Sequence, residues 1–313
     1  MATMKAIRIH EFGGPEKLLY EDAPIPTPRP GEALLRVHAA GVNPVDWKVR
    51  EGYTEKIWKH TLPLILGWDV SGVVESVGEG VTDVKVGDEV YADTEITRDG
   101  AYAEYVIVRA SLLAPKPKSA SHLEAASLPI AALTAYQALF EAAGLTAGQT
   151  VLIHAAAGGV GSLGVQMAKN IGARVIGTAS ARNHAFLKEL GADELVDYNT
   201  VKFEEVVKNV DVVFDTMGKE IQARSWACLK PGGYLVGITS DVDEADAARR
   251  GFRGSHVMAR SNAKDLITIA DMVDAGKLKP LVTEVYPLAE TRKAHEHMET
   301  GHTRGKIVLN VTG

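Results

Sequence analysis

Short apolar runs alternate with glycine and proline through the first hundred residues of the chain. The runs EALLRVHAAGVNP, GWDVSGVVESVGEGV, VGDEVYA and AYAEYVIV each have the pattern of a strand bounded by a turn signal. The segment PIPTPRPGE (24–32) contains four prolines, so it cannot pair as a central strand. This part of the chain is therefore predicted to form an irregular, all-β region.

The pattern changes from about residue 121 onward. Ser121 is followed three residues later by Glu124, which is the order of a helix capping box, and the apolar residues that follow have helical spacing. After residue 150, apolar strands alternate with helices, including a helix expected over 221–233. Strict alternation of strand and helix predicts an α/β fold with a doubly wound parallel sheet. The segment 277–313 predicts a strand, a helix and a final strand that return to the first domain.

The composition excludes several classes of protein. With 313 residues, of which 46% are apolar and 24% charged, the chain is long enough for two globular domains and is not predicted to be disordered. Its net charge of -6 and isoelectric point near 6.0 provide no basic field, so we expect neither a nucleic-acid partner nor a membrane partner. The most membrane-like stretch, 126–145, is interrupted by proline and polar residues, which predicts a helix buried in a soluble core.

The single cysteine, Cys228, excludes an internal disulfide and a four-cysteine zinc site. One cysteine is compatible with a reducing compartment, so we expect a cytoplasmic protein. The first residues include Lys5, Arg8 and Glu11 before any long apolar core can form. This pattern predicts a first strand and not a secretory signal.

A turn of small residues between a strand and a helix suggests a pyrophosphate site in the segment VLIHAAAGGVGSLGVQMAK (151–169). Ala155, Gly158 and Gly161 occupy the three small positions, and Gly159 and Val160 complete the start of the helix. Small residues let the backbone approach a phosphate, and the helix start supplies amide donors with a partial positive charge. The alternative is a tight turn that only packs the helix on the sheet. The order of strand, turn and helix favours a dinucleotide.

The end of the next strand distinguishes between the two nicotinamide cofactors. A site for NAD usually places Asp or Glu there, and the charge of that residue would repel a 2′-phosphate. This strand ends in TASARN, so Ser180, Arg182 and Asn183 take the place of the acid, while Asp193 and Asp197 come too late in the sequence. The residues predict NADP(H), with an ordinary surface role for Arg182 as the alternative.

Several segments in the same order give the chain a resemblance to the medium-chain dehydrogenase/reductase superfamily: GVNPVDWKVREGY, GWDVSGVVESVGEGVTDVKVGDEV, AAAGGVGSLGVQMAK, LKELGADELVDY, DVVFDTMG, GKLKPLV and GKIVL. The chain most resembles the zinc-free quinone oxidoreductase (zeta-crystallin-like) and alkenal/enone reductase branch. The resemblance implies a GroES-like β-rich catalytic domain formed by 1–122 and 266–313, and a Rossmann NADP(H)-binding domain over 123–265. It also implies a cleft between the two domains for nicotinamide and substrate.

The resemblance also implies that the catalytic zinc of the related alcohol dehydrogenases is absent. Those enzymes have a cysteine in the segment that matches GVNPVDW, and Gly-His-Glu where this chain has Gly67, Trp68 and Asp69. Asn43 and Trp68 are not zinc ligands of the usual kind. A group of imidazole and carboxyl side chains near the C-terminus belongs to a predicted polar helix face and turn, so we expect no metal site there either. Its members are His295, Glu296, His297 and His302.

The resemblance implies candidate site residues along most of the chain. Lys48 matches a lysine of alkenal/enone reductases, and we expect it to act in catalysis with Tyr53 and Asn43; a solvated surface position is the alternative for Lys48. Asp46 matches a residue near the nicotinamide, with a cap or turn role as the alternative. Tyr198 matches a tyrosine near the 2′-phosphate, with packing alone as the alternative. The residues expected to contact the cofactor are Asn43, Asp46, Lys48, Ala155, Gly158, Gly159, Val160, Gly161, Ser180, Arg182, Asn183, Tyr198, Thr216, Gly237, Ile238, Ser255, His256 and Val257.

Without a metal to polarise an alcohol, the substrate has to be electrophilic already. The resemblance implies an NADPH-dependent reductase that passes hydride to a quinone or to the C=C bond of an α,β-unsaturated carbonyl compound, where hydrogen bonding to the developing oxygen anion suffices. The segment RSNAKDL (260–266) is also similar to enone reductases. An enoyl-thioester reductase of the same fold and a non-catalytic NADPH-binding protein like the lens crystallins stay open as alternatives. We expect a homodimer.

Overall fold

The computed structural model describes residues 2–312 of the chain. These residues form two compact units, each with its own strands and core. Unit 1 contains the residues up to Ile130, then Ser261–Gly276 and the residues from Pro280 onward; unit 2 contains Ala131–Arg260 and Lys277–Lys279. No helix among the described residues is both long and apolar enough to cross a membrane.

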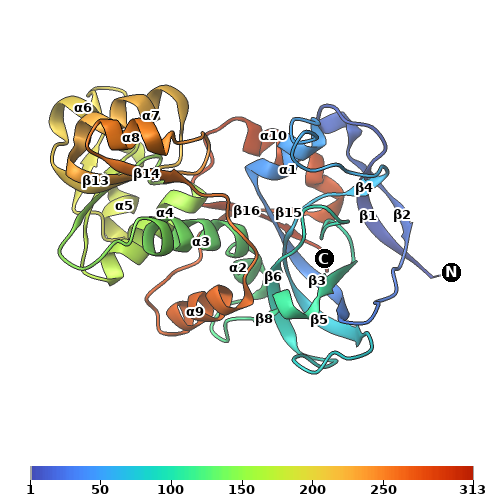
Figure 1. Cartoon of the computed structure of the whole chain (residues 1–313). Coiled ribbons are helices and arrows are strands. Elements are labelled where there is room, and N and C mark those ends of the chain that lie inside the picture. The colour runs from blue at the N-terminus through green and yellow to red at the C-terminus, as the bar shows by residue number, and fades with distance from the viewer. Residues whose placement is uncertain (1, 313) are drawn as a thin grey trace. The chain divides into compact units, whose positions relative to one another are not determined.

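Unit 1 is built on two sheets. A seven-stranded, mainly antiparallel sheet has the order β15-β16-β3-β5-β6-β8, with β7 paired to β3 as well, and a three-stranded sheet has the order β2-β1-β4. The strands are β1 (Thr3–Ile9), β2 (Leu19–Pro24), β3 (Glu32–Val42), β4 (Leu64–Ile65), β5 (Asp69–Val77), β6 (Glu89–Asp93), β7 (Tyr105–Arg109), β8 (Ala114–Pro115), β15 (Val282–Pro287) and β16 (Lys306–Asn310). The C-terminal β16, red in Figure 1, pairs antiparallel with the blue β3. The last segment therefore returns to the first domain, as its strand pattern predicts.

Short helices flank these sheets. They are α1 (Pro44–Arg50), α2 (His122–Ala126), α9 (Ala263–Asp274) and α10 (Thr291–Glu299). The predicted capping box is confirmed, because the Ser121 N–H donates to the Glu124 carboxylate at 2.8 Å and the Glu124 N–H donates back to the Ser121 hydroxyl at 3.3 Å. The core includes Leu35, Trp68 and Tyr102, none of which is more than 2% exposed. Tyr102 and Trp68 bring polar atoms into this core, and both find acceptors there.

Unit 2 is a parallel sheet of six strands in the order β11-β10-β9-β12-β13-β14. The strands are β9 (Thr150–Ile153), β10 (Arg174–Thr178), β11 (Glu194–Val196), β12 (Val210–Asp215), β13 (Leu229–Gly237) and β14 (Arg253–His256). The helices are α3 (Pro129–Tyr136), whose first two residues belong to unit 1, and α4 (Gly159–Asn170), α5 (His184–Glu189), α6 (Phe203–Val206), α7 (Lys219–Ser225) and α8 (Glu244–Arg249). In chain order the strands run 3-2-1-4-5-6, which is the Rossmann arrangement. The predicted doubly wound parallel sheet is confirmed.

The apolar runs of unit 2 become central strands because both faces of the sheet are covered. Val151, Leu152 and Ile153 in β9 are all fully buried, as is Val175 in the neighbouring β10. Helix α4 buries a continuous run from Gly161 to Ala168. Strand β9 is apolar on both faces, and α4 follows it after a short turn. This turn therefore lies at the edge of the sheet.

Two elements differ from the sequence pattern. The helix expected over 221–233 ends early, because α7 stops at Ser225, a short 3-10 turn follows over Trp226–Cys228, and Leu229 already pairs with Val210 in β13. Pro231 and the glycines after it cannot continue a helix, so this outcome follows from local chemistry. The helical pattern after Ser121 is also divided between α2 and α3, with a wider π-type turn over Gln137–Ala142.

Candidate cofactor and active site

The turn between β9 and the start of α4 forms a concave backbone surface, here called the cradle. Its residues are Ala155, Gly158, Gly159, Val160 and Gly161. Ala155 has a positive φ of 43°, and Gly158 is the N-cap of α4, where no side chain caps the helix. The first amide groups of α4, at Gly159, Val160 and Gly161, have no acceptor within the helix. A helix start of this kind favours an anion as the partner of its amides.

The two glycines of the cradle differ in what their missing side chains do. A Cβ on Gly161 would lie 2.4 Å from the carbonyl oxygen of Ala155, so the packing of α4 against the turn requires glycine there. A Cβ on Gly158 would meet, among the described residues, only that same oxygen, at 3.3 Å. A contact at 3.3 Å is tight but far less severe than the overlap at Gly161, so the packing requires glycine less strictly at 158. Space beside an amide-lined helix start fits the pyrophosphate of a dinucleotide.

The other expected cofactor contacts of unit 2 lie at the same edge of the sheet. Thr216 follows β12, Gly237 ends β13, and Ser255 to Val257 lie at the end of β14. Because the strands are parallel, their carboxyl ends and the turn after β9 share one edge. Backbone bonds join these ends, since the Ile238 N–H donates to the carbonyl at the end of β12 at 3.1 Å and the Val257 N–H donates to Gly237 at 2.8 Å. The structure therefore brings these residues together within unit 2.

His154, which directly follows β9, is buried and forms hydrogen bonds that connect the strand ends at this edge. The Ser225 hydroxyl donates to a backbone carbonyl, so it accepts the Nε2–H of His154 at 2.8 Å, while Nδ1 faces the Thr178 hydroxyl at 3.1 Å. The backbone carbonyl of His154 accepts the Thr216 hydroxyl at 2.8 Å. Burial lowers the pKa of His154 to about 3, so the ring is neutral. A polar residue inside the apolar run VLIHAAA is the only sequence signal for this role.

The turn after β10 presents the residues expected at the 2′-phosphate. Ser180 precedes a 3-10 turn over Ala181–Asn183, and the Asn183 amide donates to the Ser180 hydroxyl at 3.3 Å. Arg182 and Tyr198 are exposed, Tyr198 at 55%. Packing alone does not explain a tyrosine with this exposure. Ser180, Arg182 and Asn183 thus supply a hydroxyl, a guanidinium group and an amide from the turn after β10.

Asp197 lies beside this turn, although it comes one strand later in the sequence. Its carboxylate accepts the N–H of Asn199 at 3.0 Å and the backbone N–H of Ala181, and these bonds, that of Asn199 first, lower the pKa of Asp197. The physical reason is that β11 is the parallel neighbour of β10, which places the residue after β11 at the same edge. Asp193 lies at the opposite end of β10, where it accepts the Val175 N–H at 2.8 Å.

Helix α1 in unit 1 and the residues on either side of it include those expected to be catalytic. Asn43 precedes the helix, and Asp46 in its first turn accepts the Asn43 N–H at 2.8 Å. Lys48 is half-buried, with its ammonium group 5.8 Å from the centre of the Trp47 ring. Tyr53 is 69% exposed and packs edge-on against the same ring at 6.0 Å. The indole ring of Trp47 therefore contacts both candidate donors.

A group of buried charged side chains lies next to Asn43. Asp46, Asp69 and Asp93 are each at most 6% exposed, and Lys306 is 4% exposed. Burial raises the pKa of Asp46 to about 7 and that of Asp93 to about 8. Burial also raises the pKa of Asp69 and lowers that of Lys306. Two buried carboxyl groups therefore titrate near neutral pH.

A chain of buried hydrogen bonds runs from Arg50 to Asp46. Arg50 is fully buried and donates to Nδ1 of His295 at 3.0 Å, so the neutral ring carries its proton on Nε2, which faces the Tyr102 hydroxyl at 3.4 Å. Tyr102 in turn donates to Asp46 at 2.7 Å. Burial lowers the pKa of His295 to about 3. The expectation that His295 belongs to a polar helix face is wrong, because α10 turns this residue toward Arg50 in the core.

Asn43 and Trp68, the two residues compared above with zinc ligands, do not fit a zinc ion. The Asn43 side chain is bonded to Asp69 and Lys306, and the Trp68 indole N–H donates to the carbonyl of Arg98 at 3.0 Å. An ammonium group would repel a divalent cation, and neither an amide nor an indole supplies a zinc ligand. Within residues 2–312, no three His, Cys, Asp or Glu side chains are grouped so as to hold a metal ion.

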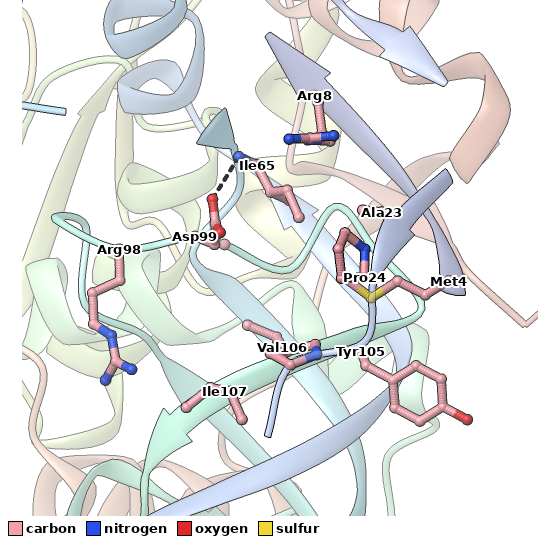
Figure 2. A pocket seen from close by; sticks show the side chains of 12 residues that line it. Met4, Arg8, Ala23, Pro24, Ile65, Arg98, Asp99, Tyr105, Val106 and Ile107 are labelled. Atoms are coloured by element: carbon pink, nitrogen blue, oxygen red, sulfur yellow. Dashed lines mark hydrogen bonds between the residues drawn. The ribbon is translucent and has the colours of Figure 1, made fainter. Parts of the chain in front are cut away.

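A separate cavity of about 210 Å³ lies in unit 1 beside β1, β2 and β7 (Figure 2). Both arginines that line it are paired, Arg8 with Glu21 at 3.0 Å and Arg98 with Glu32 at 2.8 Å. Asp99 accepts the backbone N–H of a neighbouring strand, drawn as the dashed line in Figure 2. None of the expected site residues is among those that line this cavity, so it lies outside the candidate site.

Comparison with known protein families gives two matches. The alcohol dehydrogenase GroES-like domain matches residues 29–118 of this chain. The family described as zinc-binding dehydrogenase matches residues 190–309. The second description contains zinc, although the side chains of Asn43 and Trp68 in this chain do not fit that metal.

Similar proteins match nearly the whole chain. The 2-methylene-furan-3-one reductase of Solanum lycopersicum is 37% identical over 320 residues, which cover 99% of this chain and 79% of that protein. The chloroplastic NADPH-dependent alkenal/one oxidoreductase of Arabidopsis thaliana is 36% identical over 317 residues, which cover 98% and 79%. Among solved structures, the quinone oxidoreductase from Coxiella burnetii has a TM-score of 0.92 and 38% identity, covering 99% of this chain and 100% of that chain.

Proposed function

This chain belongs to the zinc-free quinone oxidoreductase and alkenal/enone reductase branch of the medium-chain dehydrogenase/reductase superfamily, and from that premise we propose its reaction. It is an NADPH-dependent oxidoreductase that transfers hydride to a quinone or to the C=C bond of an α,β-unsaturated carbonyl compound. The observation that carries this proposal is the buried ammonium of Lys306 beside Asn43. Because that site does not fit a metal, the hydride acceptor has to be electrophilic before it binds.

For this reaction the protein has to supply little more than a hydrogen-bond donor to an oxygen of the substrate. NADPH, when bound, supplies a hydride, which is a proton with two electrons. An enone takes the hydride on its β-carbon, the C=C electron pair moves toward the carbonyl oxygen, and water then supplies the proton that bonds to the α-carbon. A quinone gains a hydride and a proton and becomes a hydroquinone. Negative charge develops on an oxygen in both reactions, and a placed donor stabilises it.

We assign the donor role to Lys48, assisted by Tyr53. Both side chains contact the ring of Trp47, which restricts where the ammonium and the phenol can lie. Asn43 has both ends of its amide bonded within the protein, so it acts on the reaction by holding the start of α1 together with Asp46. The helix then carries the backbone of Lys48 in a defined place.

We propose that the cradle before α4 holds the pyrophosphate and that the turn after β10 holds the 2′-phosphate. The cradle residues are Ala155, Gly158, Gly159, Val160 and Gly161, and the phosphate residues are Ser180, Arg182, Asn183 and Tyr198. The nicotinamide half is assigned to the remaining strand ends of unit 2, which are Thr216, Gly237, Ile238, Ser255, His256 and Val257. The shared sheet edge of these segments supports the assignment.

We further propose a cytoplasmic homodimer. Strand β14 ends the sheet of unit 2, so its outer edge can pair with the same strand of a second copy. Met258, close to that edge, is 54% exposed and adds an apolar contact. Cys228, the single cysteine, is buried, which suits a reducing compartment.

The first test is NADPH oxidation by the purified protein with a quinone, an enone and an enoyl thioester. We expect turnover with the quinone or the enone, no loss of activity after chelation, and a preference for NADPH over NADH of about tenfold or more, since a hydrogen-bonded charge is worth about 1.5–3 kcal/mol. Turnover with the thioester alone would identify an enoyl-thioester reductase. Binding of NADPH without any turnover would identify a non-catalytic protein.

The role of Lys48 is tested in the same assay. Lys48→Met is expected to lower kcat about 100-fold, because the loss of one donor to a developing oxygen anion has that effect in other enzymes. The matched control is Lys59→Met, which removes an exposed lysine from the same region. Equal kcat values for the two variants would remove Lys48 from the mechanism.

A further inference from the structure

Lys306, the first residue of β16, places an ammonium group in the core of unit 1. Its side chain is 5% exposed. The ammonium donates to the carbonyl of Val42 at 3.2 Å and to Oδ1 of Asn43, and it lies 3.6 Å from the Asp69 carboxylate. A buried lysine is costly unless it is paired and hydrogen-bonded, so these contacts explain how it is tolerated.

These contacts fix the orientation of the Asn43 amide. An ammonium group only donates hydrogen bonds, so the atom of Asn43 that faces Lys306 has to be the oxygen. The amide nitrogen then faces Asp69, to which it donates at 2.8 Å. The other carboxylate oxygen of Asp69 accepts the Ile130 N–H at 2.7 Å. The Asn43 side chain is thus held at both ends by buried groups.

The held amide belongs to the residue that begins α1. The Asn43 N–H donates to Asp46 at 2.8 Å, and the Asp46 N–H donates to the Asn43 carbonyl at 3.0 Å, so these two residues define the first turn. Lys48 follows two residues later in a helix of seven residues. Because a helix this short is marginally stable by itself, its first turn sets where the backbone of Lys48 lies.

We infer that Lys306 is a positioning residue whose ammonium group, through Asn43 and Asp69, fixes the first turn of α1 and with it the backbone of Lys48. The structural part of this inference is independent of the reaction. Its kinetic part rests on the donor role proposed for Lys48. The two parts therefore need separate measurements.

Hydrogen exchange tests the structural part. In Lys306→Met, we expect the amides of 43–51 to exchange about tenfold faster than in the unchanged protein, because local opening of the helix becomes easier. The matched control is Lys116→Met, since the Lys116 side chain is 8% exposed and its ammonium donates to the carbonyls of Pro117 and Ala120 at 3.1 and 2.6 Å. The control should leave 43–51 unchanged. Unchanged exchange of 43–51 in folded Lys306→Met would overturn the inference.

A second variant covers the case in which Lys306→Met does not fold. Removing the lysine alone leaves Asp69 as a buried carboxylate without its cation, which is strongly destabilising. The double variant Lys306→Met with Asp69→Asn removes both charges, while an amide oxygen at 69 can still accept the Ile130 N–H. Asn43 still loses the hydrogen bond from the Lys306 ammonium group, so the amides of 43–51 should exchange faster in this protein too. Full protection of 43–51 would again contradict the inference.

A double-mutant cycle tests the kinetic part. We expect Lys306→Met to lower kcat about tenfold when Lys48 is present and by less than about twofold in the Lys48→Met background, because coupled residues are not additive. Equal reductions in both backgrounds would show that Lys306 does not act through Lys48. If Lys48→Met alone leaves kcat unchanged, the proposed donor role fails, and hydrogen exchange still decides whether Lys306 positions α1.

Discussion

Gly158 and Gly161 lie three residues apart in the turn before α4, and their surroundings give them different roles. A methyl group on Gly161 would be forced against the Ala155 carbonyl at 2.4 Å, whereas one on Gly158 would meet that oxygen at 3.3 Å. Packing therefore tolerates a methyl group at Gly158 better than at Gly161, where the overlap is severe. The same substitution at each position should therefore separate cofactor binding from stability.

We predict that Gly158→Ala weakens NADPH binding about 10- to 100-fold, since one methyl group in a filled space costs about 1–3 kcal/mol. Its melting temperature should stay close to that of the unchanged protein. Gly161→Ala should lower the melting temperature by several degrees through a strain of about 1–3 kcal/mol. Fluorescence titration with NADPH and thermal melting give the two readouts. Equal NADPH affinities for Gly158→Ala and the unchanged protein would show that no phosphate lies there.

Part of the site could be predicted because some of its residues form short sequence motifs. The small-residue turn and the TASARN strand end depend on neighbours in the sequence, and the structure places both at the carboxyl edge of unit 2. Lys306 gave no such signal, because its partner Asn43 is 263 residues away. His154 and Asp93 were missed for the same reason, since a buried polar residue is recognised only by its distant partners. The residues near α1 were found by resemblance, and their roles stay predictions.

At the scale of elements, the parallel pairing of β10 and β11 brings an unexpected charge to the cofactor end of the sheet. Asp197 follows β11 and accepts the Ala181 N–H in the turn that carries Ser180 and Arg182. Its bonds hold that turn, and its negative charge lies near the place assigned to the 2′-phosphate. The two effects are separable because an asparagine at 197 keeps an acceptor and loses the charge.

We predict that Asp197→Asn tightens NADPH binding about two- to fivefold and leaves NADH binding unchanged, because exposed charges repel one another only weakly. Asp193→Asn is the matched control, since it changes the net charge equally and lies at the opposite end of β10. Titration of each variant with both cofactors supplies the measurement. An equal gain for NADH, or the same gain in Asp193→Asn, would contradict an effect on the 2′-phosphate.

Most elements could be predicted because hydrophobic periodicity is a local property. The alternation of strand and helix in unit 2 and the capping box at Ser121 follow from it directly. The helix expected over 221–233 ends at Ser225, because the residues from Leu229 onward pair in β13 and Pro231 cannot continue a helix. The depth of burial of α10 also escaped prediction, because a polar helix face gave no sign that His295 bonds to Arg50.

At the scale of the whole molecule, buried ionisable groups make stability depend on pH in two opposite directions. The pKa values of Asp46 and Asp93 are raised to about 7 and about 8, so their contribution is present at low pH and is lost as pH rises through those values. The pKa values of His154 and His295 are lowered to about 3, so their contribution is present above pH 6.5 and is lost as pH falls. Above pH 6.5 the contribution of the two histidines no longer changes, so the two carboxyl groups lower the stability as pH rises.

We therefore predict that stability falls between pH 6.5 and pH 8, by about 1.4 kcal/mol per pH unit for each carboxyl group still protonated in the folded state. Asp93→Asn should flatten this slope, because its amide mimics the protonated acid, cannot ionise and still accepts the Ser261 hydroxyl. Asp83→Asn, at an exposed position, should leave the slope unchanged. Urea unfolding at several pH values measures each slope. A slope in Asp93→Asn as steep as in the unchanged protein would mean that Asp93 is already ionised in the folded state at neutral pH.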